Sequence, residues 1–259
     1  MKTKETINHI VNWLSDYSTK SNTTGFVVGI SGGIDSALTS TLCALTGKEV
    51  ICINMPIHQF KAELDRSDEH IAWLQSQFPN IRKEKVDLTD SFETLKSALP
   101  TSTHSHLNLA NVRARVRMTT LYAYAGAEGK LVAGTGNKVE DFGIGFYTKY
   151  GDGGVDLSPI ADLNKTQVYD LCKTLGVPQS IQKAAPTDGL WEDGRSDEDQ
   201  IGASYPELEW AMEKYDNGNQ LEEFEGRQAE VFKIYQKLHR ANRHKMIPIP
   251  VCEIPKDLI

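Results

Sequence analysis

Short apolar runs alternate with amphipathic stretches along most of the chain. The runs 26–30, 50–53 and 131–134 are short and nearly continuous in apolar character, which is typical of strands buried on both faces of a parallel sheet. A third strand of the series is expected near residues 85–88. Between them, apolar residues recur at helical spacing. Strands that alternate with helices in this way predict an α/β fold with a doubly wound parallel sheet of the Rossmann-like type.

The helical stretches have recognisable limits. Asn164 can cap the amino end of a helix, Gln167 stands where its capping-box partner would, and Gly176 with Pro178 ends that helix. The expected helices, by approximate residue range, are 7–14, 37–47, 71–78, 91–99, 107–127, 164–175, 206–215 and 219–241. The last two are expected to be extra C-terminal helices that pack on the sheet domain.

Two stretches lack these patterns. Residues 136–160 are rich in glycine, and a loop of this length inside a domain is usually functional or disordered. Residues 184–204 are polar, acidic and interrupted by glycine and proline, so we expect a mobile lid there. No repeat or shift in composition divides the chain, and residues 1–259 are therefore expected to form a single domain.

The composition excludes several classes of protein. Hydrophobic residues make up 39% and charged residues 24% of the 259 residues, as in an average globular domain. The net charge of -7 argues against a general binder of nucleic acid or anionic membranes. The chain has neither an apolar run that could span a membrane nor a signal-peptide pattern. Its four cysteines lack CxxC spacing, so we expect a cytoplasmic protein with reduced cysteines.

The clearest chemical motif follows the first expected strand. Residues 29–36 read GISGGIDS, and small residues between a strand and a helix let backbone N–H groups approach a phosphate at the positive end of the helix dipole. Ser31 and Ser36 can donate hydroxyl hydrogen bonds to the same anion. A plain tight turn is the alternative, but such a turn does not require so many glycines and serines.

Other motifs of this kind fit the chain poorly. A Walker A loop requires GxxxxGK[ST], which neither 47–49 nor 129–131 supplies. The dinucleotide pattern GxGxxG, begun at Gly134, fails because Val139 stands at the third glycine. Residues 29–33 formally match the GxSxG nucleophile elbow, but the strand and oxyanion loop that should precede the elbow are missing upstream.

What remains is SGGxDS at residues 31–36, which resembles the pyrophosphate-binding loop of the N-type ATP pyrophosphatases, or PP-loop enzymes. Further segments resemble one group of these enzymes, the ammonia-dependent NAD synthetases: residues 111–118, Gly134 and Thr135 with Glu140, 146–156, Pro159, 163–165, 185–188, and His244 with Lys245. The resemblance covers nearly the whole chain and implies a sheet of the adenine nucleotide alpha hydrolase type.

The resemblance also implies roles for individual residues. The ATP contacts would be Gly29, Ile30, Ser31, Gly32, Gly33, Ile34, Asp35, Ser36, Thr135, Lys165 and Thr187. The contacts to deamido-NAD would be Arg115, Lys149, Asp156, His244 and Lys245. Asp35 and Glu140 would hold Mg²⁺, and Asp35, Lys165 and Asp156 would take part in catalysis. The resemblance further implies ATP as co-substrate and a homodimer that binds small molecules but neither nucleic acid nor membranes.

One departure from the resemblance concerns the metal. The spacer between Glu140 and Phe146 is longer by one residue than expected, which leaves the second metal ligand open between Glu140 and Asp141. Mg²⁺ prefers one or two carboxylates plus phosphate oxygens, which suits Asp35 beside the phosphate loop. The alternatives are a carboxylate that only interacts with the helix dipole for Asp35, and a solvated loop acid for Glu140.

Two groups of cations carry further expectations. Arg113 and Arg117 are four residues apart and share a helix face, whereas Arg115 points roughly opposite. The three arginines therefore cannot all meet one ligand, and a solvated basic stripe is the alternative for at least one face. Lys165 follows the cap Asn164 and places a cation at the positive end of a helix dipole, which is unfavourable unless an anion binds there. Chance placement is the alternative for Lys165.

The implied reaction joins deamido-NAD, ATP and ammonia into NAD, AMP and pyrophosphate. A carboxylate is a poor acyl donor, and transfer of AMP to it creates an acyl-adenylate that ammonia can attack. No segment is left for a glutaminase, so free ammonia is the expected donor. Two alternatives remain: a PP-loop enzyme with another acceptor, and a nucleotide-binding sensor that needs neither paired metal acids nor a second nucleotide site.

Overall fold

Four parallel strands form the centre of the structure, a computed structural model that describes residues 1–184, 186 and 196–258. The strands are β1 (Gly25–Gly29), β2 (Glu49–Asn54), β3 (Ile81–Lys85) and β4 (Leu131–Val132). They lie in the order β3-β2-β1-β4. Val27 of β1 pairs with Ile51 of β2 on one side and with Val132 of β4 on the other. The parallel α/β sheet expected from the sequence is therefore confirmed.

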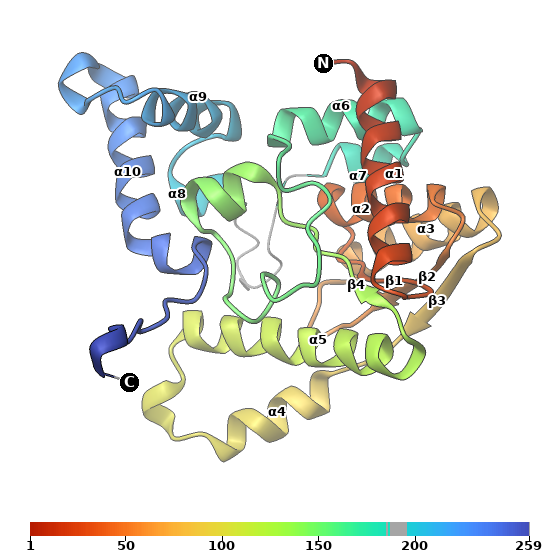
Figure 1. Cartoon of the computed structure of the whole chain (residues 1–259). Coiled ribbons are helices and arrows are strands. Elements are labelled where there is room, and N and C mark those ends of the chain that lie inside the picture. The colour runs from red at the N-terminus through yellow and green to blue at the C-terminus, as the bar shows by residue number, and fades with distance from the viewer. Residues whose placement is uncertain (185, 187–195, 259) are drawn as a thin grey trace.

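Helices cover both faces of the sheet (Figure 1). The helices on one face are α1 (Thr3–Lys20), α2 (Ile34–Leu45), α3 (Lys61–Gln77) and α6 (Lys165–Leu175), and those on the other are α4 (Thr89–Ala98) and α5 (His106–Glu128). Val28 and Cys52 pack in the first layer, whereas Val27 and Ile51 pack in the second. Because successive strand residues point to opposite faces, strands covered on both sides need the continuous apolar runs that the sequence shows.

The extra C-terminal helices form a third layer with its own apolar cluster. In this layer α9 (Tyr205–Asp216) and α10 (Gly226–Met246) pack against the π-helix η2 (Val139–Ile144). Leu208, Phe232 and Tyr235 are fully buried at its centre. Figure 1 shows this layer beside the sheet rather than on one of its faces. The π-helix therefore joins the core of the C-terminal helices to the loop that follows β4.

The remaining described helices are short. They are α7 (Gln179–Gln182), α8 (Asp197–Ile201), η1 (Thr101–Thr103), η3 (Leu221–Glu223) and η4 (Lys256–Leu258). Across the described residues, no helix combines the length and the apolar character needed to cross a bilayer.

Some expected boundaries were wrong. The third strand spans 81–85 rather than 85–88, because Ile81 pairs with Val50 and Lys85 with Asn54 at the edge of the sheet. The apolar side chain of Leu88 instead packs in the layer of α4 and α5. An edge strand is open on one side and tolerates charges, so its polar sequence gave a weak signal.

Other helix limits also differ. The last long helix begins at Gly226 rather than at 219, because residues 221–223 form a separate 3₁₀ turn before it. The first helix extends over 3–20 rather than 7–14, and the expected loop 136–160 contains η2.

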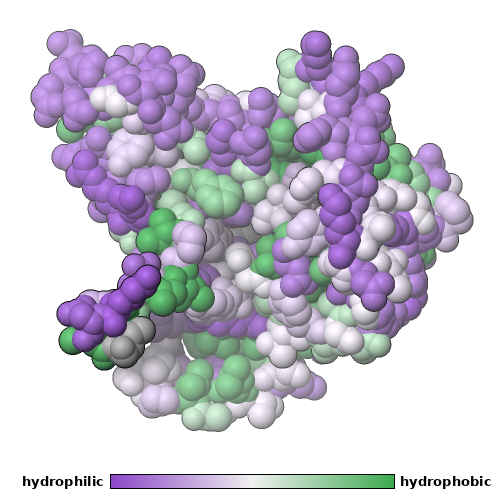
Figure 2. Space-filling model, viewed as in Figure 1, coloured by the Kyte–Doolittle hydropathy of each residue, from purple (hydrophilic) through white to green (hydrophobic). Residues whose placement is uncertain are grey.

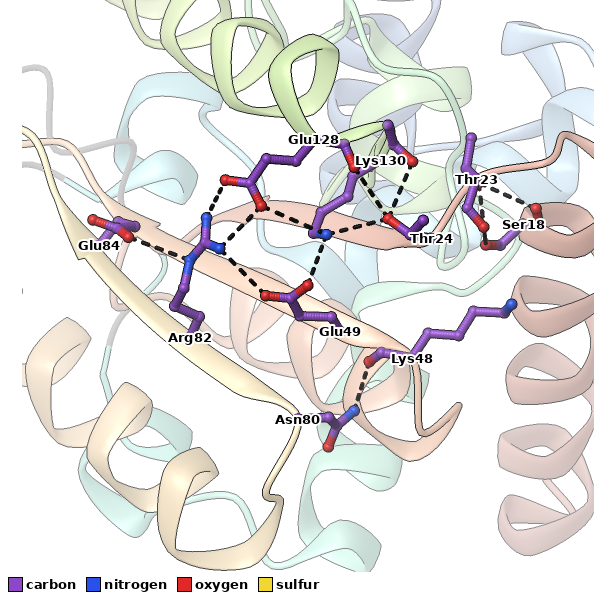
Figure 3. Close-up of polar contacts among 11 residues, drawn as sticks. Ser18, Thr23, Thr24, Lys48, Glu49, Asn80, Arg82, Glu84, Glu128 and Lys130 are labelled. Atoms are coloured by element: carbon purple, nitrogen blue, oxygen red, sulfur yellow. Dashed lines mark hydrogen bonds and ion pairs between the residues drawn. The ribbon is translucent and has the colours of Figure 1, made fainter.

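A network of charges joins the strands at the end where they begin (Figure 3). Arg82 of β3 donates to both carboxylate oxygens of Glu128, and the Nζ of Lys130 lies 2.9 Å from Glu49 Oε2. The Lys130 side chain is only 3% exposed, and a buried cation is costly without a partner. The network stabilises the end of the sheet opposite the loop that follows β1.

Apolar side chains are exposed beyond the end of α10. Ile247, Ile249 and Val251 are 42%, 65% and 81% exposed. Figure 2 shows green surface where this segment leaves α10, beside the mostly purple surface of α9 and α10. Exposed apolar patches often mark contact surfaces.

His70 of α3 is a fully buried titratable group that contacts α2. Its Nε2 lies 2.8 Å from Ser40 Oγ of α2, and its ring stacks on Trp73. Burial lowers the pKa of His70 from 6.5 to about 3. The folded state therefore excludes a proton that the unfolded chain binds below pH 6.5.

We expect His70 to make the fold sensitive to acid. Since its pKa in the folded state is depressed, the free energy of unfolding is highest above pH 6.5 and falls as the pH drops toward 3. Between pH 7 and pH 5 the wild type should lose about 2 kcal/mol more than His70→Gln, which cannot titrate. Urea denaturation of both proteins at the two pH values measures this difference. Equal losses would show that His70 is not the responsible group.

Candidate functional site

A cavity of about 680 Å³ opens at the carboxyl ends of β1, β2 and β4. Its lining comes from the loop after β1, the residues that follow β2 and β4, the inner side of α5, η2 and the start of α6. The strand order reverses here, since β2 lies on one side of β1 and β4 on the other. Open α/β sheets bind their ligands at such a point.

The loop after β1 has the geometry of a phosphate site. Gly32 has a φ of +87°, and a Cβ added there would lie 2.7 Å from the backbone oxygen of Glu63, so only glycine fits. Gly33 is the capping residue before α2, and it carries no side chain that could cover the first N–H groups of the helix. The hydroxyls of Ser31 and Ser36 lie 3.1 Å apart. The start of α2 and two hydroxyls thus face the cavity, an arrangement that binds phosphate.

Lys165 forms a buried cluster with Asp35 and Glu140. Its Nζ lies 2.6 Å from Asp35 Oδ2 and 3.0 Å from Glu140 Oε1, and its side chain is 4% exposed. Burial lowers the pKa of Lys165, but the charges of Asp35 and Glu140 outweigh burial and raise this pKa above its ordinary value. Burial also raises the pKa of Asp35, which the charge of Lys165 opposes. The cluster, which we call the Lys165 cluster, therefore sets one cation against two acids beside the phosphate loop.

The two acids of the Lys165 cluster suit a hard divalent cation. Asp35 and Glu140 approach the same ammonium from α2 and from η2, so their carboxylates face one another. Mg²⁺ is usually bound by one or two carboxylates together with phosphate oxygens and waters. Among the described residues no group of three or more metal-ligating side chains converges, so nucleotide phosphates would have to complete such a site. The donor set fits Mg²⁺ that arrives with a nucleotide.

The spacer after Glu140, which the resemblance expects to be shorter by one residue, lies mostly in the π-helix η2. A π-turn holds one residue more than an α-turn, and π-turns occur often at functional sites. Glu140 stays at Lys165, whereas Asp141 lies against Gly136, where an added Cβ would be 2.2 Å from both carboxylate oxygens. Burial and the charge of Glu140 raise the pKa of Asp141 well above its ordinary value. The geometry favours Glu140 over Asp141 as the partner of Asp35.

Tyr205 completes the Lys165 cluster, although no sequence motif indicated it. Its hydroxyl donates to Glu140 Oε1, and Lys165 Nζ lies 4.6 Å from the centre of its ring. Tyr205 stands at the start of α9, after the capping residue Ser204. A tyrosine in an amphipathic helix reads as a core residue, so only the fold reveals that its hydroxyl reaches the site.

Three residues expected to bind deamido-NAD gather outside the cavity. The Nε of Arg115 donates to the backbone oxygen of Lys149 at 3.2 Å, and the Nζ of Lys149 donates to the backbone oxygen of His244 at 3.0 Å. Of the described residues that line the cavity, none belongs to this trio. Lys245 does line it, with its Nζ bound to two backbone carbonyls. We call Arg115, Lys149 and His244 the cationic patch, after the positive charges of Arg115 and Lys149.

Asp156, expected to act in catalysis and in substrate binding, is held against the sheet. Its Oδ2 accepts a hydrogen bond from Val132 N at 2.8 Å, and its Oδ1 accepts one from the Tyr122 hydroxyl at 3.0 Å. It is absent from the described residues that line the cavity, whereas Thr135 is among them. The contact of Asp156 with substrate stays a prediction.

The expected lid, residues 184–204, is described only in part. Thr187 lies outside the described residues, so its contact with ATP stays a prediction. In the described part, the backbone N–H of Asp197 donates to the backbone oxygen of Pro186 at 3.0 Å. Closure of a lid on ligand binding also stays a prediction.

The arginines of α5 point in different directions, as the helical spacing predicted. Arg117 donates from Nε to the backbone oxygen of Met55 at 3.0 Å, and Arg113 lies over the ring of Phe92. Burial lowers the pKa of Arg117 to about 10. Arg115 is exposed on the other side. The shared face of Arg113 and Arg117 is therefore not a solvated stripe.

The chain is similar to known proteins over most of its length. It matches the family described as NAD synthase over residues 6–248. The NH(3)-dependent NAD(+) synthetase of Carboxydothermus hydrogenoformans is 37% identical over 246 residues, which cover 93% of this chain and 94% of that protein.

Solved structures are similar to this chain over nearly its whole length as well. NMN synthetase from Francisella tularensis superposes with a TM-score of 0.84 at 32% identity, covering 99% of each chain. The NH3-dependent NAD synthetase from Campylobacter jejuni shares the fold, with a TM-score of 0.80 at 24% identity over 98% of this chain and 100% of that one.

If Asp35 and Glu140 hold Mg²⁺ against nucleotide phosphates, both should control magnesium-dependent binding of ATP. We expect Asp35→Asn and Glu140→Gln each to weaken ATP binding in the presence of Mg²⁺ by about tenfold or more. Calorimetric titration with ATP, with Mg²⁺ and with a chelator, measures the effect. Asp141→Asn is the matched control, since it neutralises the adjacent acid and should change affinity much less. If Glu140→Gln left the affinity for ATP unchanged and Asp141→Asn lowered it, the second magnesium ligand would be Asp141 instead of Glu140.

Proposed function

The chain belongs to the NAD synthase family, and we propose that its cavity carries out the ATP-dependent amidation of deamido-NAD by ammonia. The products are NAD, AMP and pyrophosphate, so the protein is a ligase that forms a C–N bond. The observation that carries the proposal is the Lys165 cluster beside the phosphate loop, where an ammonium and two carboxylates lie at the point at which ATP phosphates would bind.

The chemistry requires activation of a carboxylate. An oxygen of the nicotinate carboxylate attacks the α-phosphorus of ATP, the bond between the α-phosphorus and the bridging oxygen breaks, and pyrophosphate leaves. Ammonia then attacks the carbonyl carbon of the acyl-adenylate, AMP leaves with the carboxylate oxygen, and the nitrogen loses a proton. Neither step needs a covalent bond to the protein, so positioning and charge stabilisation carry the catalysis.

Residues of the cavity supply that stabilisation. The N–H groups at the start of α2 and the ammonium of Lys165 would hold the charge of the departing pyrophosphate. Asp35 and Glu140 would hold Mg²⁺, which when bound supplies positive charge to the phosphate oxygens. Because Lys165 stands at the positive end of α6, a bound anion there relieves the unfavourable placement of its charge.

We also propose a homodimer and a cytoplasmic setting. Lys245 lies in the cavity while the cationic patch lies outside it, so a dinucleotide held by both must extend beyond one subunit's cavity. The exposed apolar residues after α10 would be covered by a second subunit. All four cysteines are free thiols, which supports a reducing compartment.

A second candidate substrate is nicotinate mononucleotide, which carries the same carboxylate without the adenylyl half. It is favoured by the NMN synthetase from Francisella tularensis, which matches 99% of this chain at 32% identity. The chemistry at the Lys165 cluster would be the same for both substrates. Only the residues that contact the adenylyl half would distinguish the two substrates.

Turnover with each substrate tests the proposal. With ATP, Mg²⁺ and ammonium, the protein should release AMP and pyrophosphate in step with amide formation, and deamido-NAD should give a higher kcat/KM than nicotinate mononucleotide. Chromatographic separation of the nucleotides measures both rates. A higher kcat/KM for the mononucleotide would assign the second candidate. Release of AMP without either substrate, or of ADP and phosphate, would contradict the proposed reaction.

A further inference from the structure

Tyr205 brings a buried hydroxyl to the Lys165 cluster from a separate layer of the fold. The residue is 3% exposed and begins α9, whereas Glu140 belongs to η2 and Lys165 begins α6. Its Oη lies 2.5 Å from Glu140 Oε1 and 3.4 Å from Asp197 Oδ2. A phenol has one proton to donate, and the shorter distance places that hydrogen bond on Glu140.

Tyr205 and Lys165 contact the same oxygen of Glu140. The Nζ of Lys165 lies 3.0 Å from Oε1, which is also the oxygen that accepts from Tyr205. With two donors on Oε1, the second oxygen, Oε2, would be the one to meet a cation brought into the cavity. Hydrogen bonds to ligating carboxylates fix their orientation in metal sites.

The two donors differ in what a nucleotide does to them. Lys165 is shared between Glu140 and Asp35, and its ammonium is also the group placed to meet phosphate charge. If phosphates drew Lys165 away from the acids, the hydroxyl of Tyr205 would still be a donor to Glu140. The ring of Tyr205 lies under the ammonium, 4.6 Å from Nζ, and a cation–π contact of this kind is compatible with a small movement.

We propose that Tyr205 is a positioning residue that orients Glu140 for the divalent cation bound with ATP. This inference rests on the proposed function only in that ATP and Mg²⁺ are the ligands of the Lys165 cluster. The C-terminal helices would then contribute to the site, because α9 supplies the hydroxyl while the phosphate loop and Lys165 come from the sheet domain.

Tyr205→Phe tests the role, because it removes the hydroxyl and keeps the ring. Calorimetry of ATP binding without the second substrate should show that half-saturation requires about tenfold more Mg²⁺ than in the wild type. ATP binding in the presence of a chelator, and the thermal midpoint, should stay close to wild type. Tyr235→Phe is the matched control, since Tyr235 is fully buried and its hydroxyl has no partner among the described residues. This control should leave the magnesium dependence unchanged.

A double-mutant cycle shows whether Tyr205 acts through Glu140. In the Glu140→Gln background, Tyr205→Phe should cause little further change in the magnesium dependence, because the carboxylate that it orients is gone. Additive effects would overturn the proposal. So would an unchanged magnesium dependence in Tyr205→Phe, or an equal loss of ATP binding with and without Mg²⁺ together with a lower thermal midpoint. The proposed function fails on a different result, namely that the wild type forms no AMP from either carboxylate substrate.

Discussion

The burial of the Lys165 ammonium constrains the rest of the structure. A buried charge costs several kcal/mol unless ion pairs and hydrogen bonds compensate it, and here the side chain is 4% exposed at the positive end of α6. Asp35 and Glu140 provide the compensation from two other segments. Three parts of the chain that are far apart in sequence must therefore meet at one nitrogen atom, and the phosphate loop lies directly beside them.

The fold makes this meeting possible through its sheet. In a parallel sheet the carboxyl ends of the strands lie at one edge, and the reversal of strand order between β1 and β4 opens a crevice there. Asp35 follows β1, while the segment after β4 leads into η2 and Glu140. The charged network of Arg82, Glu128 and Lys130 stabilises the opposite end. The stabilising charge network therefore lies at the amino ends of the strands, and the candidate site lies at their carboxyl ends.

The elements that could be predicted from the sequence are those that depend on patterns among neighbouring residues. The buried strands, the phosphate loop and the capped helix that starts at Lys165 each depend on neighbouring residues, and the structure contains all three. The polar edge strand β3 was misplaced because its apolar signal lies in the connector that follows it. Tyr205 and the contacts of Asp156 with Val132 depend on packing between distant elements. No local pattern encodes such contacts.

The path of the carboxylate oxygen tests the proposed chemistry most directly. If the Lys165 cluster and the phosphate loop activate a carboxylate by adenylyl transfer, deamido-NAD labelled with ¹⁸O in its nicotinate carboxylate should pass one labelled oxygen to AMP. Mass spectrometry of the products should find no label in pyrophosphate. Label in pyrophosphate, or AMP that carries none, would show that the carboxylate does not attack the α-phosphorus and would contradict the acyl-adenylate mechanism.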